Sequence, residues 1–253
     1  MSVGNTLLKS WWVRHLVVIV LSAAGTALFL YSRAQWSEMH RWNRAIGDMS
    51  LVLVALAMML GPMSRLWRVF VKVLPYRREL GIYAVLLALI HATIILFGWV
   101  QLDLMRLIGF EFHPGLQQYV MFQQGFGLAN LIGVLALLYG AILAITSNDA
   151  SIRWLGNSVW KFVQQGTYVL WWLSVIHTGY FLFLHFLDFD RPTPEPNWFQ
   201  WPFVGIVGVV TLLQIAASTS TWPSSVMTYC RAGAGCQSRS YVSSFSRKTM
   251  PVA

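Results

Sequence analysis

Apolar residues gather along the chain into six runs of about the length that a bilayer-spanning helix needs. The runs are His15–Tyr31, Ser50–Val71, Leu80–Val100, Phe126–Thr146, Val159–Phe186 and Trp201–Ala217. Because the hydrocarbon core offers no water to backbone N–H and C=O groups, each run is expected to be a helix. The pattern therefore predicts an all-α, polytopic membrane protein, a bundle of six transmembrane helices.

The polar stretches divide the chain into two parts. Residues 1–217 are predicted to form one six-helix domain. From Ser218 onward the chain is rich in Ser, Gly and Arg and shows no periodicity, so residues 218–253 are predicted to be a polar, disordered cytoplasmic tail. The half-apolar segment Gln101–Gln124 is expected to lie in the membrane interface. No internal repeat is evident.

Composition agrees with the membrane assignment. The chain is 57% hydrophobic and 11% charged, whereas soluble domains carry about 25% charged residues. The net charge of +9 comes from basic residues in short loops between apolar runs. We therefore expect contacts with lipid headgroups and no binding of nucleic acid.

The basic residues also predict an orientation. If the N-terminus is cytoplasmic, the inside segments hold most of the 18 Lys and Arg residues, and the outside loops hold only Arg33, Arg41, Arg44, Arg106 and Arg191. This asymmetry follows the positive-inside rule and predicts that both termini are cytoplasmic. Cys230 and Cys236 would then face a reducing compartment as free thiols.

Two histidines lie inside apolar runs and at similar depth. His91 and His177 both precede the outer end of their helices by about two and a half turns. Two neutral imidazoles from facing helices are what a six-coordinate haem iron requires. The alternative, that each histidine hydrogen-bonds to a neighbouring helix, remains open. His185, two turns after His177, could face a haem propionate or an outside partner, or be an interfacial residue. His15 is expected at a helix entrance and His40 and His113 in outer loops, all three as solvated or interfacial side chains.

Arg77 and Arg78 form a basic corner where the third helix begins. Such charges orient the helix and contact anionic lipids. They could instead form a docking site for an anionic electron donor such as a flavin phosphate, and both interpretations remain open.

Several motifs in order along the chain resemble the ferric-reductase-like transmembrane domain. They are Pro62, Arg77-Arg78, Leu80-Gly81, Tyr83-Ala84, His91, the LAITS segment from Leu143 to Ser147, Leu155-Gly156, Trp160, Tyr168 and His177. Within that family the likeness is greatest to the haem-binding membrane subunit of the bacterial periplasmic methionine sulfoxide reductase system. The resemblance covers about Gly47 to Tyr180.

The resemblance implies a multi-pass protein of the bacterial inner (plasma) membrane that holds b-type haem. His91 falls on the family's ligand in the third helix and His177 on the second ligand in the fifth. Electrons would come from a quinol or a cytoplasmic flavin donor and leave towards a periplasmic acceptor. The partners it implies are a protein subunit or a soluble periplasmic redox protein.

One departure from the family pattern limits the count of haems. The family usually carries another histidine in the fifth helix, at the position of Gln164 here, and glutamine is a poor iron ligand. We therefore expect one haem per chain. No Gly-rich nucleotide loop is present, so we expect an electron-transfer component rather than a complete enzyme. The alternative is a non-redox structural or accessory subunit of a larger membrane complex. The sequence names neither the donor nor the acceptor.

Overall fold

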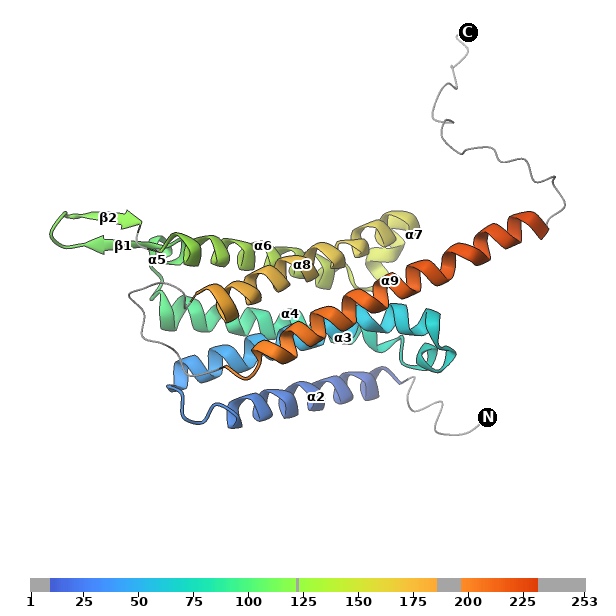
Figure 1. Cartoon of the computed structure of the whole chain (residues 1–253), viewed down its shortest axis with the longest axis horizontal. Coiled ribbons are helices and arrows are strands. Elements are labelled where there is room, and N and C mark those ends of the chain that lie inside the picture. Colours follow the sequence, from blue (N-terminus) through green and yellow to red (C-terminus); the bar gives the residue numbers. More distant parts are fainter. Residues whose placement is uncertain (1–9, 122, 186–196, 232–253) are drawn as a thin grey trace, which may run out of the picture.

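A computed structural model describes residues 10–121, 123–185 and 197–231, with side chains as far as residue 220. The long helices lie side by side in one bundle (Figure 1). They are α2 (Trp11–Tyr31), α3 (Glu38–Leu66), α4 (Tyr76–Ile94), α6 (Gln124–Thr146), α7 (Asp149–Gln165), α8 (Thr167–Gly179) and α9 (Gln200–Arg231). Within the described ranges, 6 helical segments are long and apolar enough to cross a membrane, because α7 and α8 form one of them. The predicted six-helix fold is confirmed.

The two ends of the bundle carry different connecting elements. At one end, here called the basic end, α2 begins, α3 ends and α4 begins, and the short helix η1 (Arg68–Lys72) connects α3 to α4 (Figure 1). The other end, here called the hairpin end, carries the one-turn helix α5 (Leu104–Leu107) and two paired strands, β1 (Phe110–His113) and β2 (Gln118–Met121). Successive long helices therefore cross the bundle in alternating directions.

Helix α3 is the centre of the bundle. It packs against α2, α4 and α9. Its buried face mixes large apolar residues such as Leu53 with small ones such as Ala45 and Ala55, each at most 1% exposed. Small side chains let helix backbones approach closely, which is the main source of packing where lipid tails are as apolar as the helices.

Three boundaries differ from the expected ones. Helix α3 begins at Glu38, well before the expected Ser50, and its first buried residue is Ala45. Helix α7 begins at Asp149, before the expected Val159, and is kinked at Gly156, whose φ of 75° suits glycine. Helix α9 continues past Ala217 to Arg231, while residues 232–253 lie outside the described residues.

The segment Gln101–Gln124, which was expected to lie in the membrane interface, contains the helix α5 and the strands β1 and β2. Strands β1 and β2 are antiparallel, with Phe112 opposite Tyr119 and ring centroids 5.6 Å apart. Such cross-strand aromatic pairs stabilise two-stranded ribbons. The hairpin projects beyond the ends of the neighbouring helices (Figure 1).

A buried ion pair joins α2 to α3 at the hairpin end. Arg33 Nη2 donates a hydrogen bond to Asp48 Oδ2, and the two side chains are 1% and 4% exposed. The guanidinium of Arg33 also lies over the rings of Phe29, Trp36 and Trp198. Burial removes both charges from water, so each depends on the other for compensation.

We predict that Asp48→Leu lowers the free energy of unfolding by about 3–5 kcal/mol, because it leaves the Arg33 charge buried without a carboxylate. The double variant Arg33→Met/Asp48→Leu should recover most of this loss. Unfolding by detergent titration, followed by circular dichroism, measures both. A double variant no more stable than the single one would contradict the assignment.

Candidate cofactor site

His91 and His177 face each other in the middle of the bundle. His91 comes from α4 and His177 from α8. Their ring centroids are 6.3 Å apart and the ring planes are nearly perpendicular, at 85°. This is the one pair of facing histidine rings in the described part of the chain. The structure brings together the two histidines that the sequence placed at similar depth.

Each imidazole is fixed by one backbone carbonyl. His91 Nδ1 lies 3.0 Å from the carbonyl oxygen of Asn43, and His177 Nδ1 lies 2.8 Å from that of Ala129. A carbonyl oxygen only accepts, so each Nδ1 carries the hydrogen and donates it. The lone pair of each neutral ring is therefore on Nε2, the atom left available to a metal.

A glycine makes room behind each ring. A Cβ atom at Gly133 would stand 2.7 Å from His177 Nδ1 and Cε1, and one at Gly47 would stand 3.0 Å from His91 Nδ1. The contact at Gly133 would force the ring or the helix to move, and the contact at Gly47 would require a smaller adjustment. Gly47 and Gly133 thus allow the imidazoles to lie close to α3 and α6.

The two histidine positions are near copies of one another. The ring and its carbonyl partner are separated by 48 residues in both cases. In both, the glycine follows the carbonyl residue by one helical turn. Each histidine helix then continues as a π-helical turn, η2 (Ile95–Trp99) after α4 and η3 (Tyr180–Leu184) after α8. Such turns are frequent at functional sites. The spacing from the glycine to the histidine is the same in both places. This equal spacing can be recognised in the sequence once the contacts are known.

A cavity of about 440 Å³ surrounds the two rings. This volume is in the usual range for sites that bind small molecules and cofactors. The lining is mainly apolar and comes from α3, α4, α6 and α8. The polar side chains of the lining are His40, Asn43, Arg44, Asp48, Ser50, Asn130, Ser174, Thr178 and His185, in addition to the two central histidines.

The donor set suits a metal that is already held by a planar macrocycle. No group of three or more His, Cys, Asp or Glu side chains that could hold a bare ion occurs in the described residues. Two imidazoles supply only two ligands, one from each side. With nitrogen about 2.0–2.1 Å from a metal and roughly 1.1 Å from its own ring centre, two such rings would stand roughly 6 Å apart. The observed separation of 6.3 Å fits this arrangement.

Arg44 is the cationic group of the cavity. Its Nη2 donates to the Phe181 carbonyl oxygen at 3.3 Å, and its guanidinium lies 5.7 Å from the centre of the Phe181 ring. No carboxylate of the described residues lies within ion-pair distance of Arg44. The cavity thus offers one positive group to an acidic substituent of a ligand.

His185 and His40 also line the cavity. His185 is 8% exposed and lies among the rings of Phe126, Tyr180 and Phe181. It is therefore a buried residue of the site. His40 lies in the first turn of α3 and stacks edge-on against Trp99, with centroids 4.5 Å apart. The expectation that His40 lies in an outer loop is wrong, because α3 begins earlier than the apolar run.

The remaining candidates lie away from the cavity. Arg77 and Arg78 are exposed at the basic end, and Arg78 forms an ion pair with Asp149 at 3.2 Å. Gln164 donates through Nε2 to Thr146 Oγ1 at 3.1 Å and to the Leu143 carbonyl at 3.4 Å. Gln164 therefore ties α7 to α6 in place of a ligand.

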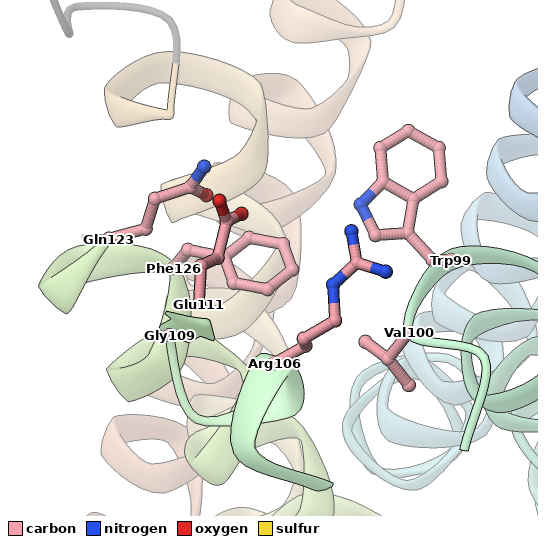
Figure 2. A pocket seen from close by; sticks show the side chains of 7 residues that line it. All are labelled: Trp99, Val100, Arg106, Gly109, Glu111, Gln123 and Phe126. Carbon is pink, nitrogen blue, oxygen red and sulfur yellow. The ribbon is translucent and has the colours of Figure 1, made fainter. Parts of the chain in front are cut away.

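A second, smaller pocket of about 50 Å³ opens at the hairpin end. Trp99 and Phe126 line both this pocket and the large cavity. Figure 2 shows the Arg106 guanidinium turned toward the Trp99 indole and the Glu111 carboxylate turned toward the Gln123 amide. The small pocket therefore adjoins the large cavity at the hairpin end.

The sequence matches the family of ferric reductase like transmembrane components over residues 46–175, just over half of the chain. The chain belongs to this family. The matched region begins in α3 and ends in α8. It includes Gly47, His91 and Gly133, and it stops just before His177. A comparison with curated proteins finds no match.

We predict that Gly133→Ala displaces the His177 ring and weakens its hydrogen bond to Ala129. Nitrogen-15 NMR of histidine-labelled protein should show His177 as the Nδ1–H tautomer in the wild type and as a shifted or mixed signal in the variant. Gly208→Ala on α9 is the matched control, because a Cβ there meets nothing within 4 Å. An unchanged His177 signal in Gly133→Ala would contradict the predicted crowding.

Proposed function

We propose that this protein is a membrane electron-transfer protein in which His91 and His177 would hold the iron of one b-type haem. The observation that carries the proposal is the arrangement of the two imidazoles. The ring centroids are 6.3 Å apart, both rings are held through Nδ1 by backbone carbonyls, and their separation suits a metal between them. Haem supplies a one-electron carrier when it is bound.

The protein's contribution is to hold and tune that carrier. The carbonyls of Asn43 and Ala129 keep each ring in one tautomer and orientation, which raises the basicity of Nε2. The apolar lining excludes water from the site. Arg44 would hold an acidic side group of the haem at the hairpin end, and His185 would lie beside it.

The count of one haem per chain follows from the ligands. Gln164 is engaged by Thr146 and Leu143, and the described residues provide no second pair of facing histidines.

We propose that electrons enter from a quinol or a cytoplasmic flavin donor and leave at the hairpin end. The small pocket between Trp99 and Arg106 adjoins the cavity there.

For the setting of the protein we propose the bacterial inner membrane, with both termini cytoplasmic and the hairpin end periplasmic. The acceptor would be a partner subunit or a soluble periplasmic redox protein, such as a methionine sulfoxide reductase. We assign Arg77 and Arg78 to orientation and lipid contact. Arg78 is already paired with Asp149, and both arginines are separate from the cavity.

The ligand assignment predicts that His91→Ala and His177→Ala each lose the six-coordinate haem spectrum while the protein still inserts. Removal of either imidazole leaves one axial position without a ligand. His113→Ala, in the exposed hairpin, is the control and should keep the spectrum. Reduced-minus-oxidised absorption spectra of purified protein measure the result.

The number of haems bound per chain, determined as the pyridine haemochrome, should be one. A reproducible value of two would contradict the ligand count. A wild-type chain that binds no haem when haem is supplied would contradict the proposed function. It would instead favour a non-redox accessory subunit.

The proposed orientation predicts that a membrane-impermeant thiol reagent leaves Cys230 and Cys236 of intact cells unlabelled and labels them after permeabilisation. Gln117→Cys, in the exposed turn of the hairpin, should be labelled from outside and serves as the control. Labelling of the natural cysteines in intact cells would reverse the orientation.

A further inference from the structure

The small pocket at the hairpin end lies where two spanning segments end. Trp99 is the last residue of one segment, and Gln123 directly precedes the next, Gln124–Thr146. Both residues line the pocket of about 50 Å³, together with Arg106 from α5 and Glu111 from β1. The ends of spanning segments lie at the level of the lipid headgroups, where tryptophan is enriched. The pocket is therefore at headgroup depth.

One side of the pocket carries two hydrogen-bond donors. Figure 2 shows the Arg106 guanidinium beside the nitrogen of the Trp99 indole. Guanidinium and indole nitrogens donate hydrogen bonds and do not accept them. The Trp99 ring is held edge-on against His40, with ring centroids 4.5 Å apart. Neither donor side chain forms a hydrogen bond or ion pair with another of the described residues. An oxyanion would supply the acceptor that this side lacks.

The other side of the pocket carries a negative charge. The Glu111 carboxylate is turned toward the Gln123 amide (Figure 2). An ionised carboxylate only accepts, whereas an amide presents either its oxygen or its nitrogen. Glu111 and Arg106 line the same pocket, yet they are not among the ion pairs of the described residues. A ligand between them would have to carry both a negative and a positive group.

The size of the pocket limits the ligand. A volume of about 50 Å³ has room for about three to five water-sized groups. This excludes a ring system and admits the polar part of a small zwitterion. An oxyanion would lie against Arg106 and Trp99, and a primary ammonium would lie against Glu111. The charges therefore favour a phosphate or carboxylate that is linked to an ammonium group.

Exposed apolar side chains lie next to the polar lining. Leu104 and Met105, which precede Arg106 in α5, are 65% and 38% exposed, and Phe112, which follows Glu111, is 48% exposed. Neighbouring exposed apolar residues mark contacts with membranes or partners. A soluble zwitterion would leave these side chains uncovered, whereas the acyl chains of a phospholipid would cover them. The surroundings thus favour a lipid as the source of the zwitterion.

We propose that Trp99, Arg106 and Glu111 bind the headgroup of one phosphatidylethanolamine molecule at the hairpin end. The lipid phosphate accepts hydrogen bonds from the Arg106 guanidinium and the Trp99 indole. The lipid ammonium donates to the Glu111 carboxylate. Because Trp99 and Phe126 line both pockets, the bound headgroup lies next to the large cavity. The inference does not depend on a haem in that cavity.

The test titrates the purified full chain in detergent micelles with phosphatidylethanolamine, phosphatidylcholine and phosphatidylglycerol that carry the same acyl chains. Native mass spectrometry measures the dissociation constant of the first lipid bound. The wild type should bind phosphatidylethanolamine at least about 10-fold more tightly than phosphatidylcholine, the scale of one charge-assisted hydrogen bond. The reason is that the trimethylated nitrogen of phosphatidylcholine has no hydrogen to donate to Glu111.

Two variants separate the two ends of the headgroup. Arg106→Gln should weaken the binding of the ethanolamine and choline lipids alike, by about 10-fold, because both carry the phosphate. Glu111→Gln should weaken only phosphatidylethanolamine and so remove the preference. Glu38→Gln and Arg41→Gln are matched controls at the same end of the bundle, because neither residue lines either pocket. Both controls should leave the dissociation constants unchanged.

Equal affinity of the wild type for the ethanolamine and choline lipids would overturn the proposal. So would tightest binding of phosphatidylglycerol, or a Glu111→Gln protein that keeps the preference. Free phosphoethanolamine should compete only at far higher concentration than the lipid, because it has no acyl chains. Competition at equal concentration would overturn the lipid assignment in favour of a soluble zwitterion. None of these measurements involves haem, so the proposed function is tested separately.

Discussion

The structure depends on how two imidazoles are kept inside an apolar bundle. Each ring nitrogen that carries a hydrogen must find an acceptor, and no water is available at this depth. The carbonyls of Asn43 and Ala129 supply the acceptors, each from a helix adjacent to the one that carries the histidine. That requirement fixes α4 against α3 and α8 against α6. The cavity is the space left between these two helix pairs.

The glycines follow from the same constraint. A ring whose Nδ1 reaches a carbonyl on the neighbouring helix lies against that helix's backbone, so the residue one turn further on cannot carry a side chain. Gly47 and Gly133 meet this demand at equivalent places. The repeated arrangement holds the two imidazoles in matching ways, with the same spacings along the sequence at both places.

Charge is distributed differently at the two ends of the bundle. At the hairpin end, Arg33 and Asp48 neutralise each other, while Arg44 remains available to the cavity. At the basic end, Arg14 contacts only one oxygen of Glu79, so the carboxylate keeps an acceptor free. The first arrangement suits the binding of an acidic group of a cofactor. The two ends of the bundle therefore bury their charges in different ways.

The sequence by itself determined the number of spanning helices, their approximate places and the two histidines at matched depth. These features depend on hydropathy and on spacing along single helices, which are local properties. Only the tertiary structure decided where α3 begins, because Arg44 and Asp48 look like loop residues until partners from other helices surround them. The roles of Gly47, Gly133 and Glu79 were likewise decided by contacts between residues far apart in the chain. A glycine or a carboxylate in a helix has no assigned neighbour until the helices are packed, and the neighbour is what gives it a function.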